Sequence, residues 1–502
     1  MVAFADLSLS FLTGLSGLTV RDASSGSLDA ACTGNTQLEV RSTVCSQIAA
    51  ALTSSSSVVY YPGSAQYIKD NYHWAASSNQ ASQCSFEPAT AEDVGVALRI
   101  LGQTQTPFGV KSGGHATNAG FSSTSGVEIA LYSFSDVVYN STTQTATLGM
   151  GLIWDEVYVA LEPYGMTVVG PKITGIGIGG ITLGGGYSYL TNQYGLGIDS
   201  VVAYELVMPN GTVADITEST EPDLFFALRG GFNNFGIVTT VTVNTHPQSQ
   251  VWGGLVSYSQ NQWAAASSAI ANFSANVTDP KASMYNAYNY ISGVPIMANI
   301  LFYDAPTPPE GMFDEFLAIP AIVAAVSTRS YVDLVQSLPL NATAGLRTVF
   351  SSVAMEDVTV PVLDMIVNET TFWSKKLASS SAGIVTYGVD VFLPTIYDHV
   401  ASPTAYPPSR SQGYSFIELF YGWTQSNYDS TIFDAVSAST QHMLQSLVND
   451  GQDVAGVAVY PNHAPPNTSL ETMYGDNVPR LQAIKNAVDP DNVMALTGGW
   501  KF

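Results

Sequence analysis

The fold is decided by two glycine-rich stretches, Gly109-Val-Lys-Ser-Gly-Gly-His-Ala-Thr-Asn-Ala119 and Gly170-Pro-Lys-Ile-Thr-Gly-Ile-Gly-Ile-Gly-Gly-Ile-Thr-Leu-Gly-Gly-Gly186. The first follows a helical pattern and an extended Thr-Pro-Phe step, which predicts a strand that runs into a glycine turn and presents His115. Because glycine lacks a Cβ atom, its backbone N–H groups can approach an anion closely. Two such segments suit a pyrophosphate group.

The second stretch contains a Gly-x-Gly-x-x-Gly string from Gly175 to Gly180, with Asp199 about 20 residues downstream. A dinucleotide-binding fingerprint of this kind has to open a helix. Here the string continues into Ile181-Thr-Leu and three consecutive glycines, each of which disfavours a helix by about 1 kcal/mol relative to alanine. We therefore expect neither a helix nor a Rossmann-type NAD site. Glycines that only form tight turns are the alternative for any single position.

Composition and charge limit the possible classes of protein. A chain of 502 residues is too long to fold around one hydrophobic core of ordinary size, so we predict two domains. The hydrophobic content of 46% excludes a disordered chain. The 16 basic and 40 acidic residues give a net charge of −24, which argues against nucleic acid or an anionic membrane surface as a partner. Beyond the first 22 residues, no run approaches the roughly 20 apolar residues of a membrane span.

The N-terminus and the glycosylation sequons indicate a secreted, extracellular protein. Residues 1–22 have the length and apolar character of a signal peptide, although they lack a basic start and contain Asp6. Asn-x-Ser/Thr sequons suit a glycosylated secreted protein and are merely permitted in a cytosolic one. They begin at Asn140, Asn210, Asn272, Asn276, Asn341, Asn368 and Asn467. Three cysteines, Cys32, Cys45 and Cys84, match no zinc pattern, so we expect no metal site.

The periodicity of the apolar residues predicts an α+β protein. Thr90 and Asp93 resemble a helix-capping box, and Val94, Leu98 and Leu101 then recur on one helical face. From about residue 251 onward, adjacent strand patterns among helices predict an antiparallel sheet covered by helices. Strands are expected over residues 108–111, 126–134, 146–151, 201–208, 212–216, 237–243, 283–291, 296–303, 383–393 and 414–423, and helices over 154–161, 222–228, 262–273, 312–318 and 430–448.

Further motifs follow along nearly the whole chain. They are Ser112-Gly-Gly-His115, Gly184-Gly-Gly-Tyr187, Tyr194-Gly-Leu196, Asp223-Leu-Phe-Phe-Ala-Leu-Arg-Gly-Gly231, Asn234-Phe-Gly-Ile-Val238, Tyr474-Gly-Asp-Asn477 and Asp489-Pro-Asp-Asn-Val493. Each motif alone is weak, but their order and spacing are specific. Together they resemble the berberine-bridge-enzyme-like branch of the vanillyl-alcohol-oxidase, or PCMH-type, flavoproteins.

This resemblance implies a two-domain fold with a discontinuous FAD-binding domain. Residues 23–250 would form the FAD-binding domain, residues 251–454 the substrate-binding α+β domain, and residues 455–502 a segment that returns to the first domain. The resemblance also implies a Cys45–Cys84 disulfide, which leaves Cys32 unpaired. Three buried thiols are the alternative.

The resemblance further implies that His115 is bonded covalently to FAD. A lone histidine in a sequence is more often a structural residue. Some relatives add a second bond through a cysteine, but none occurs between Pro171 and Gly186, so we expect a single histidyl link. The other residues expected to bind FAD are Lys111, Ser112, Gly113, Gly114, Asn118, Ala119, Gly175, Gly177, Gly179, Gly180, Thr182, Gly185, Tyr187, Gly236, Ile237, Val238 and Asn462.

Glu418 is a candidate catalytic base. In the strand pattern Tyr414 to Trp423, a period of two places Phe416, Glu418 and Phe420 on one face. A carboxylate between two phenylalanines would be desolvated, which raises its pKa toward the range useful for a general base. The resemblance implies that Glu418 faces the flavin, and a glutamate at the solvent edge is the alternative.

Tyr460-Pro-Asn-His463 resembles a Tyr-x-Asn-Tyr segment of the family, except that His463 replaces the second tyrosine. Either His463 or Glu418 would therefore accept the proton, with Tyr460 as a further catalytic residue. A surface histidine is the alternative for His463. Tyr204, Asn233 and Asn234 are further candidates near the flavin, and Lys172 either balances the pyrophosphate charge or is solvated.

These inferences predict a secreted FAD-dependent oxidase. Hydride would pass from an alcohol, carbohydrate or secondary metabolite to covalent FAD, and O2 would be reduced to H2O2. The partners would be a small-molecule substrate and O2, without nucleic acid or membrane, and the chain would be a monomer. A flavin-scaffold cyclase of secondary metabolism and a non-catalytic secreted glycoprotein are the alternatives.

Overall fold

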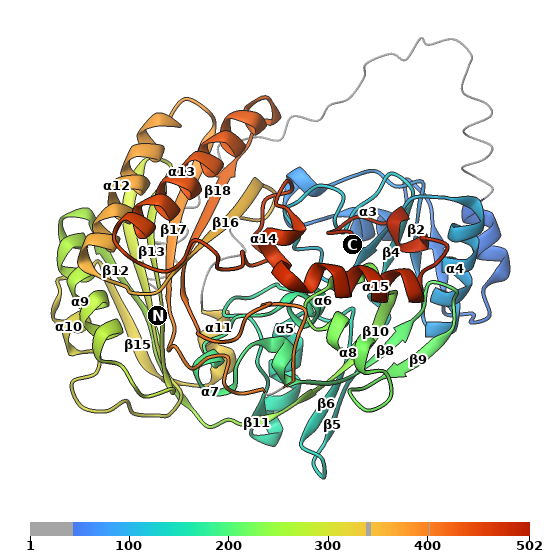
Figure 1. Ribbon diagram of the computed structural model, residues 1–502, viewed down its shortest axis with the longest axis horizontal. Coiled ribbons are helices and arrows are strands. Elements are labelled where there is room, and N and C mark those ends of the chain that lie inside the picture. The colour runs from blue at the N-terminus through green and yellow to red at the C-terminus, as the bar shows by residue number, and fades with distance from the viewer. Residues whose placement is uncertain (1–43, 338–342, 401) are drawn as a thin grey trace.

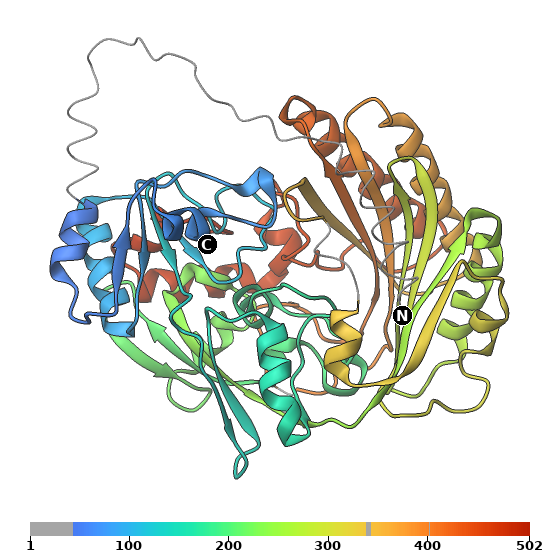
Figure 2. The same cartoon turned by 180° about the vertical axis from the view of Figure 1, so that it is seen from behind.

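The computed structural model describes residues 44–337, 343–400 and 402–502, which form two lobes side by side (Figure 1; Figure 2). One lobe contains the first part of the described chain together with the C-terminal helices. The other is built on one large antiparallel sheet covered by helices. The predicted α+β class is therefore confirmed. The predictions for residues 1–22, Cys32 and Asn341 lie outside the described residues.

The first lobe combines two sheets. In the four-stranded sheet the order is β1 (Val58–Tyr60), β2 (Cys84–Glu87), β4 (Val127–Ala130) and β3 (Phe108–Lys111), and β2, β4 and β3 are parallel. The five-stranded antiparallel sheet has the order β5 (Val137–Asn140), β6 (Thr145–Gly149), β10 (Ile237–Asn244), β8 (Val201–Val207) and β9 (Val213–Ile216). The short strands β7 (Met166–Thr167) and β11 (His246–Pro247) form a separate pair. The helices of this lobe include α3 (Ala65–Asn71), α4 (Ala91–Thr104), α5 (Trp154–Leu161), α6 (Ile178–Gly184), α7 (Thr191–Tyr194) and α8 (Pro222–Leu228).

The second lobe is a seven-stranded antiparallel sheet. Its order is β15 (Val323–Arg329), β12 (Val251–Ser259), β14 (Val294–Tyr303), β13 (Ala282–Ile291), β17 (Ala382–Val391), β18 (Ser415–Trp423) and β16 (Arg347–Met355). The helices α9 (Trp263–Asn276), α10 (Asp314–Ala318), α12 (Val360–Lys376) and α13 (Asp429–Asn449) cover the face turned away from the first lobe (Figure 1). Alternate residues of β18 are buried in the core under these helices, namely Ile417, Leu419 and Tyr421. The opposite face of the sheet is therefore turned toward the first lobe.

The C-terminal helices belong to the first lobe. The helices α14 (Leu470–Tyr474) and α15 (Val478–Val488) lie beside its sheets in Figure 1, far in sequence from the rest of the lobe. The Tyr474 hydroxyl donates to the Gly230 carbonyl at 3.0 Å, and Arg480 pairs with Asp223 at 2.7 Å.

The structure also shows what the periodicity missed. The strands β12, β15 and β16 and the long helix α12 were not among the predicted elements. The predicted capping box is only half formed, because the Thr90 hydroxyl accepts from the Asp93 N–H at 3.2 Å. The Asp93 carboxylate instead accepts hydrogen bonds from Thr53 and Ser57, so its side chain ties the N-terminal segment to α4.

The prediction that the second glycine stretch forms no helix is wrong. Residues Ile178–Gly184 form α6, in which Ile178, Ile181 and Leu183 are all buried. A Cβ atom at Gly184 would lie 2.3 Å from the ring of Phe232, so this glycine is required by close packing. Burial of the apolar side chains thus outweighs the weak helix propensity of glycine.

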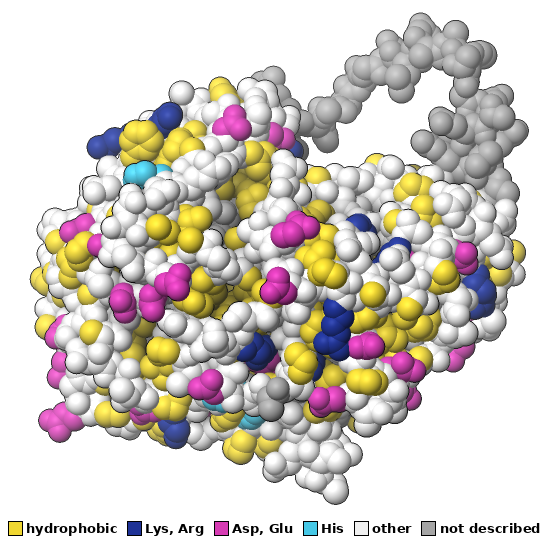
Figure 3. Space-filling model, viewed as in Figure 1, with side chains coloured by type: hydrophobic (Ala, Val, Ile, Leu, Met, Phe, Trp, Pro, Cys, Tyr) yellow, Lys and Arg dark blue, Asp and Glu magenta, His cyan; other side chains and the backbone are white. Residues whose placement is uncertain are grey.

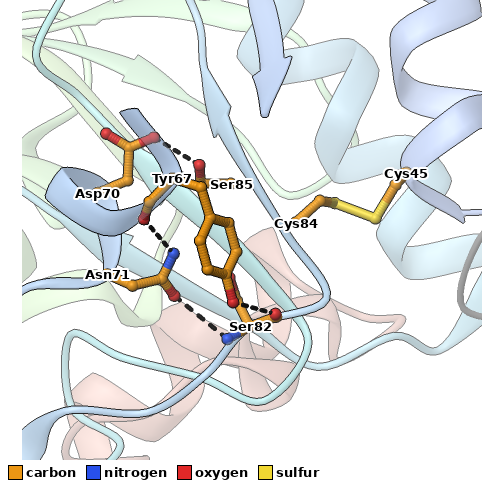
Figure 4. The surroundings of a disulfide bond; sticks show 7 residues. All are labelled: Cys45, Tyr67, Asp70, Asn71, Ser82, Cys84 and Ser85. Carbon is orange, nitrogen blue, oxygen red and sulfur yellow. Dashed lines mark hydrogen bonds between the residues drawn. A yellow bond between two sulfur atoms is a disulfide. The ribbon is translucent and has the colours of Figure 1, made fainter. Parts of the chain in front are cut away.

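The predicted Cys45–Cys84 disulfide is present (Figure 4). It joins the helix at residues 44–51 to the start of β2, across a sequence separation of 39 residues. Beside it, Tyr67 and Asn71 of α3 bond to Ser82, which leads into β2. Within the described ranges, no helix is both long and apolar enough to span a bilayer.

Candidate functional site

The two glycine stretches meet directly. A Cβ atom at Gly113 would lie 2.5 Å from the Cα and N atoms of Gly177, and one at Gly177 would lie 2.2 Å from the N atom of Gly113. The Ser112 hydroxyl donates to the Met150 carbonyl at 2.6 Å and accepts from the Gly179 N–H at 3.2 Å. The two backbones can approach this closely only because both positions are glycine. Together they form one surface with few side chains.

This surface offers unpaired backbone donors. No described residue accepts a hydrogen bond from any backbone N–H of residues 113–119. The indole Nε1 of Trp74 and the hydroxyl of Ser352 are also buried without a hydrogen-bond partner among the described residues. Buried side-chain donors are normally satisfied, so those of Trp74 and Ser352 fit a site that a bound molecule completes. A run of free N–H groups fits a phosphate-bearing cofactor.

His115 lies against Trp74, which follows α3. The two rings stack with centroids 4.0 Å apart and an interplanar angle of 17°. The Trp74 N–H donates to the Gly114 carbonyl at 3.0 Å, which fixes the loop that carries the histidine. Burial lowers the pKa of His115 to about 4, so the imidazole is neutral at neutral pH. A neutral ring nitrogen retains the lone pair that a covalent bond to a cofactor requires.

The C-terminal loop at residues 460–464 joins both glycine stretches. The Tyr460 hydroxyl accepts from the Gly186 N–H at 3.0 Å, and the Asn462 amide donates to the Gly180 carbonyl at 2.9 Å. The Asn118 amide donates to the carbonyl of Ala464, also at 2.9 Å. These contacts of Tyr460, Asn462 and Ala464 hold His463 beside the junction.

Glu418 and His463 lie together on the inner face of the large sheet. The Glu418 side chain is 17% exposed, and its neighbours Phe416 and Phe420 on the same face are buried, as the alternation predicts. Its Oε1 accepts a hydrogen bond from the Tyr285 hydroxyl at 3.0 Å, and its Oε2 lies 3.4 Å from His463 Nε2. Glu418 is therefore no solvent-edge residue.

Burial changes the proton affinity of both groups. It raises the pKa of Glu418, although the nearby Lys172 ammonium and the Tyr285 hydroxyl oppose this effect. Burial also lowers the pKa of His463 to about 4, which leaves its imidazole neutral. The ring stacks on Phe350 of β16 at 5.1 Å, so its orientation is fixed. A neutral imidazole beside a carboxylate can accept a proton.

Aromatic side chains connect this pair with His115. The ring centroids of Phe350 and Phe420 lie 4.9 Å apart. The ring centroid of Trp74 lies 6.4 Å from that of Phe350 and 5.9 Å from that of Phe420. The sequence did not identify Trp74, Phe350 or Tyr285 as site residues, because none belongs to a local motif. The only signal was their aromatic character within strand or helix patterns.

Several predicted cofactor residues have structural partners instead. Lys172 is neither solvated nor free for a pyrophosphate, because it pairs with the buried Asp390 of β17. The Lys111 ammonium donates to the backbone carbonyls of Lys69, Asp70 and Tyr72, and so closes the end of α3. These two cations therefore support the protein around the site.

Other candidates serve the packing of the first lobe. Tyr204 donates to the Thr182 carbonyl, and the amides of Asn233 and Asn234 donate to the carbonyls of Gly498 and Gly231. The remaining candidates lie in the glycine stretches or at the start of β10. The Gly175 N–H donates to the Asp155 carboxylate, the Tyr187 hydroxyl bonds to that of Tyr397, and Gly185 lies beside Tyr460. Gly236 abuts the Val207 carbonyl, Ile237 and Val238 are buried, and Ala119 is exposed. In the described part of the chain, no group of three or more His, Cys, Asp or Glu side chains could hold a metal ion.

Burial also decides the role of Tyr460. It raises the pKa of the phenol to about 12, so the hydroxyl stays protonated at neutral pH. The same hydroxyl accepts hydrogen bonds from the Gly186 N–H and from the Asn462 amide at 2.8 Å. Tyr460 therefore anchors the C-terminal loop, while His463 is the group free to take up a proton.

Comparisons with known proteins find two matching families. The sequence matches the FAD binding domain family over residues 82–217 and the berberine and berberine-like family over residues 459–497. An uncharacterized FAD-linked oxidoreductase of Arthroderma benhamiae is 40% identical over 278 residues, which are 54% of this chain and only 55% of that relative. The FAD-dependent monooxygenase drtC of Aspergillus calidoustus is 29% identical over 88% of this chain and 87% of its own.

Solved structures support the fold. The carbohydrate oxidase from Microdochium nivale, solved in complex with a substrate analogue, aligns with a TM-score of 0.74 at 20% identity, over 90% of this chain and 98% of that chain. The FAD-binding match contains both glycine stretches, and the berberine-like match contains the loop that joins them. The chain therefore contains an FAD binding domain and a berberine-like segment, which make it an FAD-linked oxidoreductase similar to the berberine-bridge-enzyme-like proteins.

Proposed function

We propose that this chain is a secreted oxidase that removes hydride from an alcohol, a carbohydrate or a hydroxylated secondary metabolite. The observation that carries the proposal is the Glu418–His463 pair, two half-buried groups 3.4 Å apart at the sheet face turned toward the His115 loop. One structural neighbour is a carbohydrate oxidase, and one relative is a monooxygenase, so both oxygen-dependent chemistry and hydroxylated substrates occur among similar proteins.

The residues present fit FAD. The free N–H groups of residues 113–119 would bind its pyrophosphate, and the neutral His115 ring would form the single covalent link. When bound, FAD supplies the acceptor for the hydride, and its reoxidation by O2 yields H2O2. Trp74, stacked on His115, would hold the attached ring in place.

His463 would accept the proton of the substrate hydroxyl. Its imidazole is neutral above about pH 4, and Glu418 Oε2 is near enough to stabilise the imidazolium that forms. Phe350 and Phe420 would exclude water from the substrate and orient it by contact with its apolar surface. The replacement of a family tyrosine by histidine thus supplies a base that is already deprotonated at neutral pH.

Secretion and glycosylation have structural support. All six sequon asparagines in the described residues are exposed, at 140, 210, 272, 276, 368 and 467. The Cys45–Cys84 disulfide suits an oxidising compartment. Acidic side chains lie scattered over the face shown in Figure 3, in keeping with a soluble monomer whose partners are a small substrate and O2.

Glycosylation can be tested at Asn467, which lies in an exposed loop. In protein secreted from a eukaryotic host, Asn467→Gln should remove one glycan and lower the mass by one step, and an endoglycosidase should remove the rest. Asn449→Gln is the control, since Asn449 is exposed but outside a sequon. Intracellular retention of the chain, or an unglycosylated secreted chain, would contradict the proposal.

Cofactor incorporation should depend on the contact between the two glycine stretches. Gly177→Ala places a methyl group 2.2 Å from the Gly113 nitrogen, so the stretches must separate and the purified protein should lose most of its flavin absorbance. Gly456→Ala is the control, because a Cβ atom there meets nothing within 4 Å. Full flavin occupancy in Gly177→Ala would show that the contact is not needed.

The covalent link can be tested by denaturing the protein in acid and recording in-gel flavin fluorescence. Wild type should fluoresce, and His115→Ala should not, because its flavin is released on denaturation. His442→Ala, on the exposed face of α13, should keep the fluorescence. A fluorescent His115→Ala band would show that another residue attaches the flavin and would refute a single link at His115.

The dependence of kcat/KM on pH should report the base. A base works in its deprotonated form, so activity should hold at neutral pH and be lost as the pH falls toward about 4, where His463 takes up a proton. Protonation of Glu418, whose pKa burial raises, adds to this acid loss. His463→Phe keeps the stacking on Phe350 but should lower kcat by about 10²–10⁴-fold. His442→Phe is the control. Full activity in His463→Phe, or wild-type activity that persists well below about pH 4, would exclude this role.

A further inference from the structure

Tyr285 reaches Glu418 by lying across an intervening strand. In the sheet, β17 separates β13, which carries Tyr285, from β18, which carries Glu418. The residue of β17 opposite Glu418 is Gly388. A Cβ atom at Gly388 would lie 2.4 Å from the Tyr285 hydroxyl and 2.8 Å from its Cζ. The phenol ring therefore occupies the space that any other side chain at position 388 would take.

This contact determines how Glu418 presents its two oxygens. Oε1 accepts the hydrogen bond from Tyr285 at 3.0 Å, while Oε2 faces His463 at 3.4 Å. A hydrogen bond donated to a carboxylate favours its ionised form and restricts its rotation. Without Tyr285, nothing described would bond to Oε1, and Glu418 could turn away from His463.

The charged and polar groups around Glu418 and Tyr285 have partners of their own. Lys172 lies 5.3 Å above the Tyr285 ring centroid, and its ammonium is paired with Asp390. Burial raises the pKa of Tyr285 well above its ordinary value, so the phenol remains a hydrogen-bond donor. The titratable groups that face Glu418 and Tyr285 are Lys172, Tyr189, Asp390, Tyr460 and His463.

We infer that Gly388 and Tyr285 are positioning residues, with the bare Cα of Gly388 allowing the Tyr285 phenol to hold Glu418 so that its second oxygen faces His463. The geometry of the resting site is independent of the proposed oxidase function. The effect on turnover rests on that function, because it requires Glu418 and His463 to act on substrate.

The test compares Gly388→Ala, Tyr285→Phe and the double variant as purified holoproteins. The first readout is an infrared pH titration of the Glu418 carboxyl, whose band is identified by its loss in Glu418→Gln. Loss of the Tyr285 hydrogen bond should raise the midpoint by about one pH unit, a tenfold change in proton affinity. Because both substitutions remove the same bond, the double variant should shift no further than either single variant.

Gly383→Ala is the matched control. Gly383 lies on the same strand, and a Cβ atom there meets nothing within 4 Å, so its midpoint should equal that of wild type. The second readout is kcat/KM. In both single variants Glu418 should face His463 for a smaller fraction of the time, so kcat/KM should fall about tenfold while KM changes little. An unchanged titration in Tyr285→Phe, or additive shifts in the double variant, would overturn the inference.

The two proposals fail separately. A protein with no oxidase activity on any hydroxylated substrate would refute the proposed function, but the infrared midpoints would still decide the roles of Gly388 and Tyr285. If Gly388→Ala does not fold, Tyr285→Phe alone decides, since removal of one hydroxyl leaves the ring packing intact.

Discussion

The contact between the backbones of Gly113 and Gly177 is the constraint on which the rest of the site depends. These residues are distant in sequence, and a single Cβ atom at either position would force the two stretches apart. Both stretches also meet the large sheet: Trp74, stacked on His115, contacts Phe420, and Lys172 pairs with Asp390. The large sheet then closes the site by contributing Glu418 and Asp390.

A second constraint links the two lobes at Trp74. Its N–H bonds to the Gly114 carbonyl, and its own carbonyl accepts from the Gly345 N–H at 2.8 Å, just before β16. The neighbouring Ala76 N–H donates to the Leu346 carbonyl at the same distance. The short segment around Trp74 therefore fixes the histidine loop and the edge of the large sheet together, so that the distance between His115 and the β16–β18 face is set by backbone hydrogen bonds as well as by ring packing.

The sequence predicted the parts of this arrangement that follow from local physics. A period of two along β18 correctly placed Glu418 between Phe416 and Phe420, and the glycine content indicated two closely packed backbones. Propensity failed at α6, where tertiary burial stabilises a helix that glycine disfavours. Neither the Lys172–Asp390 pair nor the space above Gly388 could be predicted, because each depends on which strands become neighbours in the sheet. Pattern within one segment does not contain that information.

The charges of the site explain why a histidine suits position 463. A buried phenol, such as Tyr460 with its pKa near 12, holds its proton at neutral pH and needs a cation nearby to release it. Lys172 is the nearest cation to Glu418, but Asp390 neutralises it, so little positive charge remains to ionise a tyrosine. An imidazole whose pKa is lowered to about 4 needs no such help, since it is already neutral. In the proposed reaction, Glu418 at 3.4 Å would stabilise the protonated ring, so the hydrogen bond from Tyr285 that orients this carboxylate would bear on proton uptake by His463.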